Sequence, residues 1–161
     1  MDTPSSRPQP SAPSTPVASS DLVIERVRHL LRARHLQVVR RTDISPGFVR
    51  LTLAGPDLDG FVSAGFDDHV KLILPQPGLD RPALPEMQEG RPVFSGPRPV
   101  LRDYTPARFD AAAGELDIEV ALHDAGPASD WAAAAFVGQW VGIAGPRGSM
   151  VVPTGFDWHW L

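Results

Sequence analysis

Strict alternation of apolar and polar residues late in the chain constrains the fold more than any other feature. Between residues 115 and 123 every second side chain is apolar, as in Leu116, Ile118, Val120 and Leu122, and Asp117, Glu119 and Ala121 lie between them. Because successive side chains of a strand point to opposite faces, this pattern predicts a strand with one buried and one solvated face. Strands of this kind are typical of antiparallel sheets.

Other short segments extend the same pattern to most of the chain. Runs rich in β-branched residues predict strands at 36–44, 48–53, 68–74, 100–109, 139–144 and 149–152. Ser45-Pro46-Gly47 predicts a hairpin between the first two. An Ala-rich segment at 130–137 predicts a single late helix. We therefore expect a mainly β fold, a six- to seven-stranded antiparallel Greek-key barrel over residues 36–153 that leaves no exposed edge.

The first 35 residues divide into two parts. Residues 1–20 are rich in Pro, Ser and Thr and have no apolar core, so we expect a disordered tail rather than a signal peptide or a membrane span. Residues 21–35 place Val23, Val27, Leu30 and Leu31 at helical spacing. This spacing predicts an N-terminal amphipathic helix that lies against the barrel, and no stable membrane insertion.

The composition of the chain excludes several kinds of functional site. The chain of 161 residues contains no cysteine, which excludes disulfides, thiolate metal sites and a cysteine nucleophile, and which suits a reducing cytoplasm. Its five histidines are scattered without the spacing of metal ligands. Six arginines lie between residues 26 and 41, but the net charge is −4 and no aromatic residues interleave with them. We therefore expect a solvated basic face and no nucleic-acid partner.

The segment 75–99 is rich in proline and contains Gly78, Gly90 and Gly96. Because proline cannot donate a hydrogen bond to a sheet, we expect a long surface loop without strands. Loops of this length are either functional or disordered. Two alternatives remain open: the loop borders a cofactor or substrate, or it is a disordered insertion.

Arg102-Asp103-Tyr104-Thr105 is the run with the clearest chemical content. A strand would place Arg102 and Tyr104 on one face, with Thr105 on the other face or at the edge. A guanidinium binds phosphate oxygens through forked hydrogen bonds, and a phenol covers an apolar ring. This pair suggests a flavin dinucleotide ligand. The alternative is an ordinary solvated face of an antiparallel sheet.

Four ordered motifs over about 110 residues place this run in context. They are Asp68-His69-Val70-Lys71-Leu72, Arg102-Asp103-Tyr104-Thr105-Pro106, Leu122-His123 with Gly126-Pro127-Ala128-Ser129-Asp130-Trp131-Ala132, and Gly145-Pro146-Arg147-Gly148-Ser149. In this order they resemble the siderophore-interacting proteins, which are flavin-dependent ferric-siderophore reductases. The resemblance implies an FAD-binding barrel that passes electrons from NAD(P)H through flavin to a ferric siderophore and releases Fe(II).

The same resemblance assigns roles to individual residues. Arg102 would clamp the pyrophosphate, Tyr104 would cover the isoalloxazine, and Thr105 would donate a hydrogen bond near its reactive nitrogen. His123 would contact the flavin or its ribityl chain, the alternative being a solvated residue at a strand end. No side chain would act as acid, base or nucleophile.

The resemblance also implies less specific roles for the loop before the late helix and for one lysine. The small residues Gly126, Ala128 and Ser129 would let the pyrophosphate approach the helix start, the alternative being a plain N-cap. Lys71 would contact cofactor phosphate or an anionic siderophore, the alternative being a surface cation. In the turn at 145–149, either Arg147 or Ser149 assists the cofactor or the turn is purely structural.

The chain also departs from the family pattern. The family usually has a basic residue at the position of Ala107, whereas this chain has Arg108. The resemblance further implies that residues 154–161 begin a nicotinamide-binding domain, so electrons would come from such a domain or from an external reductase. Two hypotheses follow: an oxidoreductase domain active on ferric siderophores, or a non-catalytic module that binds FAD without turnover.

Overall fold

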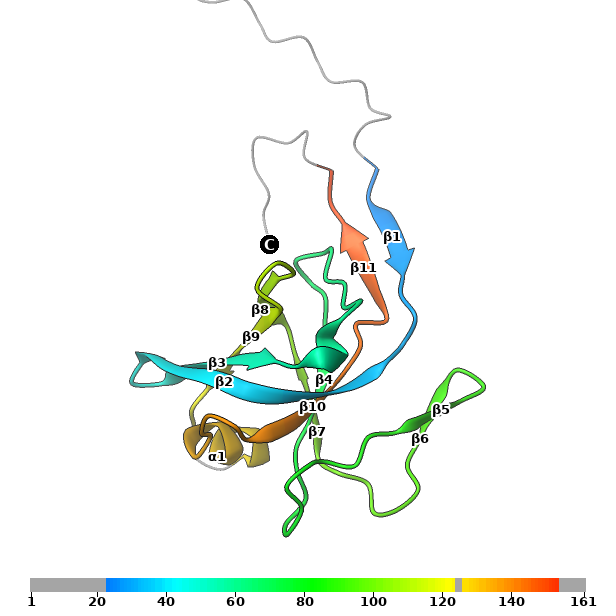
Figure 1. Cartoon of the computed structure of the whole chain (residues 1–161). Helices are drawn as coiled ribbons and strands as arrows, with labels where there is room; N and C mark the ends of the chain where they lie inside the picture. The colour runs from blue at the N-terminus through cyan, green and yellow to red at the C-terminus, as the bar shows by residue number, and fades with distance from the viewer. Residues whose placement is uncertain (1–22, 124–125, 154–161) are drawn as a thin grey trace, which may run out of the picture.

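The structure is a computed structural model that describes residues 23–123 and 126–153. Figure 1 shows its strands curling around one another, with a single α-helix packed at one end. The predictions for residues 1–20 and 154–161 lie outside the described residues. None of the helices in the described part of the chain is long and apolar enough to cross a membrane.

Seven antiparallel strands form the main sheet, in the order β7-β4-β10-β2-β3-β9-β8. These strands are β2 (Ala33–Ser45), β3 (Phe48–Ala54), β4 (Val70–Ile73), β7 (Leu101–Tyr104), β8 (Pro106–Asp110), β9 (Glu115–Ala121) and β10 (Trp140–Ala144). The 3-10 helix η2 (Pro56–Leu58) follows β3, and α1 (Pro127–Ala133) lies between β9 and β10. The expectation of a mainly β, antiparallel barrel with one inserted helix is confirmed.

The barrel is a half-barrel rather than a ring of hydrogen-bonded strands, so the expectation that it leaves no exposed edge is wrong. Its two edge strands, β7 and β8, do not pair with each other in the described structure. They are nevertheless consecutive in the chain, and Thr105 alone separates them. The predicted single strand at 100–109 is therefore divided, because Pro106 lacks an N–H group and holds the preceding residue in an extended conformation. The continuous chain joins the two edges across the opening.

The alternating residues fill the core as expected. Leu116, Ile118 and Val120 of β9 are at most 1% exposed, and they pack with the apolar side chains of β2, β3, β4 and β10. The predicted hairpin at 45–47 is confirmed by the β2–β3 pairing, which contains two register shifts. One residue departs from the pattern: Asp117, expected on the solvated face, is buried.

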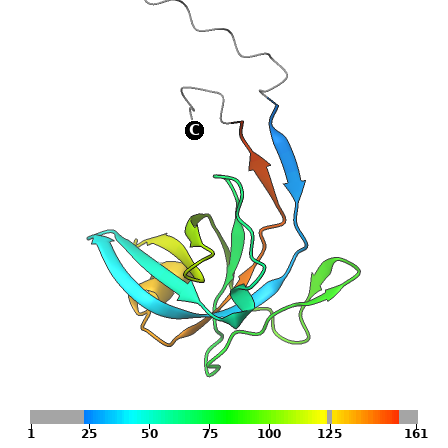
Figure 2. The same cartoon turned by 45° about the horizontal axis from the view of Figure 1, so that its top comes forward.

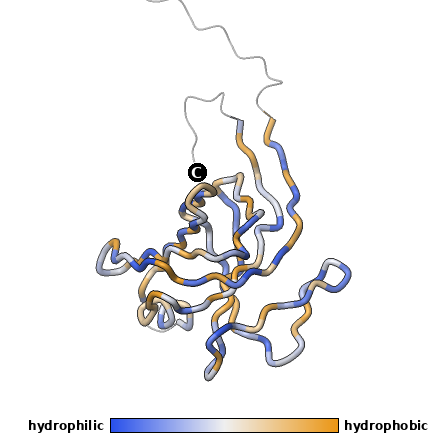
Figure 3. Tube along the Cα trace, in the orientation of Figure 1, coloured by the Kyte–Doolittle hydropathy of each residue, from blue (hydrophilic) through white to orange (hydrophobic). Residues whose placement is uncertain are grey.

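The predicted N-terminal helix is wrong. Residues Glu25–Arg28 form strand β1, which pairs with β11 (Gly148–Val151), and β2 already begins at Ala33. Figure 2 shows this two-stranded ribbon extending away from the barrel, and Figure 3 shows hydrophobic and hydrophilic residues alternating along β1. Positions i and i+4 share a face in a strand as well as in a helix, so Val23 and Val27 do not distinguish the two. Residues 25–28 form a strand because β11, which is distant in the sequence, pairs with them.

The segment 75–99 is neither free of strands nor detached from the barrel. It contains the short hairpin β5 (Glu86–Gln88) and β6 (Arg91–Val93), and Pro82, Pro85 and Pro99 are buried. Its backbone accepts a hydrogen bond at Pro82 O from the ring of His35 on β2, at 2.8 Å. The Arg81 guanidinium lies 3.7 Å from the centre of the Trp140 ring. The segment therefore packs as a cover on the outer face of the sheet.

Candidate functional site

Arg102 and Tyr104 lie on one face of β7, as the period of a strand predicts. In the antiparallel β4–β7 pair, Arg102 is opposite Leu72 and Tyr104 is opposite Val70. Both partners belong to the hydrophobic core. Because opposite residues of a pair point the same way, the guanidinium and the phenol lie at the core-facing side of an open sheet edge.

The two side chains of this pair differ in burial. Tyr104 is half-buried and packs against the core. Burial raises the pKa of its hydroxyl, and the nearby charge of Arg102 opposes that shift. Arg102 is exposed, and its Nη1 donates to the carbonyl oxygen of Leu101 at 2.8 Å. Within residues 23–123 and 126–153 the Arg102 guanidinium forms no ion pair, so it remains available to an external anion.

Thr105 lies at the break between the two edge strands. The residue before it pairs with Val70 on one edge of the sheet, and Pro106 pairs with Ile118 on the other. Thr105 is exposed. Thr105 therefore lies next to Tyr104 in the chain, at the point where the chain crosses from one edge of the sheet to the other.

A second group of predicted residues joins the end of β9 to the start of α1. The Ser129 hydroxyl accepts a hydrogen bond from the backbone N–H of His123 at 3.0 Å and donates to its carbonyl at 2.9 Å. A Cβ atom added at Gly126 would lie 3.0 Å from Cε1 of His123, so the exposed imidazole covers the helix start. Since the side chains of Ala128 and Ser129 are buried, what this turn offers a ligand is backbone N–H groups and the His123 ring.

Lys71 does not belong to the Arg102 face. It neighbours Leu72 on β4 and is opposite Asp103, so it points to the outer face of the sheet. Its ammonium donates to Asp103 Oδ2 at 2.7 Å, and both side chains are about half exposed. The structure thus separates Lys71 from the other predicted cofactor residues.

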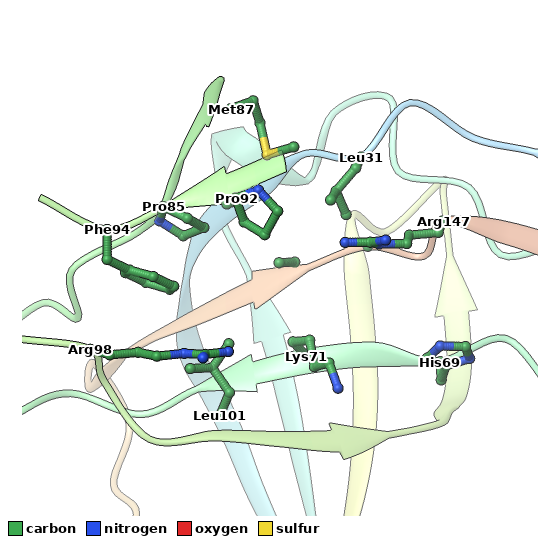
Figure 4. Close-up of a pocket in the computed structure, with 13 residues that line it drawn as sticks. Leu31, His69, Lys71, Pro85, Met87, Pro92, Phe94, Arg98, Leu101 and Arg147 are labelled. Carbon is green, nitrogen blue, oxygen red and sulfur yellow. The ribbon is translucent and has the colours of Figure 1, made fainter. Parts of the chain in front are cut away.

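The outer face carries a pocket of about 500 Å³ beside Lys71 (Figure 4). It lies between the β5–β6 hairpin, β4 and the turn that leads to β11. Basic groups line one side of it, namely His69, Lys71, Arg98 and Arg147, and apolar groups line the other, among them Met87 and Phe94. None of the described residues that line the pocket is acidic. We refer to it as the outer pocket.

Sequence reasoning found only part of the outer pocket. Lys71 and Arg147 are candidates from the sequence, and His69 lies in the same motif as Lys71, whereas no pattern points to Arg98, Met87 or Phe94. The length and proline content of segment 75–99 were the available signal. The packed hairpin argues against a disordered insertion, and a border with cofactor or substrate stays a prediction. Two residues of the turn at 145–149 lie in different surroundings. Arg147 is exposed at the pocket. Ser149 is buried, and its hydroxyl donates a hydrogen bond to Asp68 Oδ2 at 2.8 Å.

Comparison with known proteins identifies the family. A family model described as the siderophore-interacting FAD-binding domain matches residues 37–150. The chain belongs to this family. FAD is accordingly the cofactor of the domain, and the predicted resemblance is confirmed.

Individual relatives agree with this assignment. The chain is 48% identical over 135 residues to the NADPH-dependent ferric-chelate reductase of Escherichia coli, covering 84% of this chain and 53% of that protein. It is 33% identical to the ferric vibriobactin reductase ViuB of Vibrio cholerae, covering 78% and 47%. A crystal structure of a siderophore utilization protein from T. fusca superposes with a TM-score of 0.73 at 41% identity, covering 81% and 50%. The chain thus spans about half the length of the relatives it matches.

Proposed function

We propose that this chain is the FAD-binding part of a cytoplasmic ferric-siderophore reductase. Electrons would pass from NAD(P)H through FAD to the iron of a ferric siderophore, and the Fe(II) formed would be released. The observation that carries the proposal is the exposed Arg102 guanidinium, which forms no ion pair with the described residues, beside the half-buried Tyr104 ring at the open edge of the barrel. The names of two relatives, a ferric-chelate reductase and a ferric vibriobactin reductase, support the reaction.

The residues at this edge fit FAD. Arg102 would donate forked hydrogen bonds to the pyrophosphate, and Tyr104 would pack its ring on the isoalloxazine. Thr105 would place its hydroxyl at the edge of the flavin. The first turn of α1, with Gly126, would present backbone N–H groups to the pyrophosphate, and His123 would lie over the ribityl chain.

Bound FAD supplies the conversion of a two-electron hydride into single-electron transfers, which the reduction of ferric iron requires. The protein's own part is to bind, orient and exclude water. Tyr104 packs on the core, so its ring is held in place before any ligand arrives. We propose that the hydride comes from a nicotinamide-binding domain or an external reductase.

The outer pocket would receive the ferric siderophore. Its four basic side chains and the absence of acidic ones among its described lining suit an anionic chelate, and its apolar side suits the chelator's carbon skeleton. We assign Lys71 to this pocket rather than to the FAD phosphate. The pocket and the Arg102–Tyr104 edge use opposite faces of the same β4–β7 pair.

Reconstitution tests the proposal. The purified chain is mixed with FAD, and its visible spectrum and affinity are recorded. The bound flavin is then photoreduced without oxygen, and an anionic ferric siderophore is added together with a colorimetric Fe(II) chelator. We expect flavin reoxidation and Fe(II) formation in step. A chain that does not bind FAD contradicts the whole proposal, and one that binds FAD but reduces no ferric siderophore is the non-catalytic module.

A further inference from the structure

A second basic pocket lies at the base of the β1–β11 ribbon. It has a volume of about 340 Å³ and is bordered by the end of β1, the start of β2, residues 60–62 and the turn at 145–146. Its charged lining residues are Arg28, Arg32 and Arg34, accompanied by His29. No acidic residue is among its described lining. We call it the ribbon-base pocket.

Arg34 lines this pocket and is itself buried, with 4% of its surface exposed. Its Nη1 donates to the carbonyl oxygen of Gly145 at 3.1 Å, and its Nη2 donates to that of Gly60 at 3.4 Å. Its Nε is buried without a hydrogen-bond partner in the described structure. The partners of this buried cation are therefore neutral, and one of its donors is unused.

The surroundings of Arg34 add positive charge instead of balancing it. Burial lowers the pKa of its guanidinium, the charge of Arg32 lowers it further, and only Asp57 acts in the opposite direction. The Arg32 guanidinium also lies over the turn below, with Nη1 3.5 Å from the position of a Cβ at Gly60. Two like charges thus converge on a partly desolvated space, which is costly without a counter-charge.

Two other arginines of this stretch show that the chain can supply counter-charges. Arg40 pairs with Glu115, and Arg41 pairs with Asp43. Within the described ranges, by contrast, the three arginines of the ribbon-base pocket form no ion pair. The sequence-based expectation of a solvated basic face is thus wrong for Arg34, which is buried. An excess of cations around one cavity in a chain of net charge −4 marks a place for an anion.

We propose that the ribbon-base pocket binds a phosphate group, either free or at the end of a small molecule. A tetrahedral oxyanion accepts several charge-assisted hydrogen bonds at once, and guanidinium groups are suited to supply them. Arg28 and Arg32, both exposed, would donate hydrogen bonds to the anion, and the buried Arg34 beside them would add its charge. His29 is held by Ser149, its Nε2 lying 2.7 Å from Oγ, so the arginines carry the binding. The site is separate from the FAD edge and from the outer pocket, and it does not rest on the proposed function.

Calorimetric titration of the whole chain with inorganic phosphate, pyrophosphate and adenosine monophosphate, at constant ionic strength, tests this site. We expect one ligand to bind per chain, saturably, with a dissociation constant below about 10 mM. Arg32→Gln and Arg28→Gln should each weaken binding about tenfold or more, since each removes a charge-assisted contact. Tighter binding of the nucleotide than of phosphate would identify a phosphomonoester ligand, and the reverse would identify a free phosphate.

Matched controls separate this pocket from general charge. Arg91→Gln removes an exposed cation of β6, and Arg147→Gln removes one from the outer pocket, so both should leave the affinity unchanged. Arg34→Lys keeps the buried charge, and its melting temperature, measured first, shows whether the fold is intact. Absence of saturable binding to the parent overturns the inference. Equal losses in the Arg91 and Arg32 variants, or a loss confined to the Arg147 variant, also overturn it.

Discussion

The Arg108 guanidinium binds the carboxylate of Asp117 across the β8–β9 pair, with Nε 2.7 Å from Oδ2. A register shift between Pro106 and Arg108 turns the arginine toward this partner. Its other nitrogens donate to Asp110 at 3.0 Å and to Glu115 at 2.6 Å. The family's usual basic position, three residues after Tyr104, is Ala107 here. The shift thus gives Arg108 a structural role: it holds the edge strand that begins directly after Thr105.

We therefore expect Arg108→Ala to destabilise the fold by about 1–3 kcal/mol, because it leaves a buried carboxylate without its cation. Arg50→Ala is the matched control, since Arg50 pairs with Glu119 from a neighbouring strand with similar exposure of the arginine. Glu119 is far more exposed than Asp117, so the control should cost less than about 1 kcal/mol. Urea unfolding followed by tryptophan fluorescence measures both. Equal losses of stability in the two variants would show that the Arg108–Asp117 pair contributes no more than the exposed Arg50–Glu119 pair.

The same cluster predicts a specific loss of stability in acid. Burial alone would raise the pKa of Asp117, but hydrogen bonds from Arg108 and Thr52 outweigh it, so the pKa is lowered. A hydrogen bond from Arg40, followed by one from Arg108, lowers the pKa of Glu115. Groups whose folded pKa is depressed contribute stability above their unfolded pKa of about 4 and lose it as the pH falls through the folded value.

The free energy of unfolding should therefore fall steeply below about pH 4. In Asp117→Asn the fall should be shallower, from a lower plateau at neutral pH. Urea midpoints measured from neutral to acidic pH test this. Parallel acid profiles of parent and variant would contradict the assignment.

How far the sequence predicted this structure depends on the range of the interactions. Alternation in 116–122 predicted β9, and Ser45-Pro46-Gly47 predicted the β2–β3 hairpin, because both patterns are local. The common face of Arg102 and Tyr104 followed from the period of a strand in the same way. The mainly β, antiparallel class of the fold could therefore be predicted, whereas the N-terminal helix and the full closure of the barrel were wrong.

What could not be predicted depends on segments distant in sequence. Strand β1 exists because β11 pairs with it, and its own pattern fits a helix equally well. Arg98 joins Lys71 and Arg147 at the outer pocket only because segment 75–99 packs back on the sheet. The exclusion of Lys71 from the Arg102 face follows from the register between β4 and β7, which the sequence of either strand alone does not fix.

Arg102→Ala should weaken FAD binding by about 2–3 kcal/mol, a loss of about 30- to 150-fold in affinity, because a charge-assisted phosphate contact is removed. Arg102→Lys should recover part of it, since an ammonium keeps the charge without the forked geometry. Arg91→Ala, at an exposed site on β6, is the control for charge. Quenching of FAD fluorescence measures the affinities. An unchanged affinity in Arg102→Ala would remove Arg102 from the cofactor site.

Gly142 is expected to be essential for the cover formed by segment 75–99. A Cβ at this position of β10 would lie 2.7 Å from Cδ2 of Leu84 and 2.9 Å from Cβ of Ile73. Gly142→Ala should therefore destabilise the fold by about 1–3 kcal/mol through overpacking and should speed proteolysis within 75–99. Gly96→Ala, whose Cβ would meet nothing within 4 Å, is the control and should change stability by less than about 0.5 kcal/mol. Equal protease resistance of the two variants would show that the cover tolerates the methyl group.

The Lys71–Asp103 pair predicts opposite effects on an anionic substrate. Both side chains are about half exposed beside the outer pocket, so the pair contributes little to stability but sets the local charge. Asp103→Asn leaves Lys71 uncompensated, whereas Lys71→Gln removes the cation and leaves the carboxylate. Because charge at the mouth of a pocket steers ions of opposite sign, the first variant should speed electron transfer to an anionic ferric siderophore and the second should slow it.

We expect changes of about threefold to tenfold in the second-order rate constant at low salt, shrinking as ionic strength rises. Stopped-flow reoxidation of the photoreduced flavin by the chelate measures them, at equal FAD occupancy in all variants. A neutral ferric chelate is the control, because neither substitution should alter its rate. Rates that change in the same direction in both variants, or equally for the neutral chelate, would show that the outer pocket does not receive the ferric siderophore. Retained FAD binding in the same samples would leave the cofactor assignment of Arg102 and Tyr104 standing.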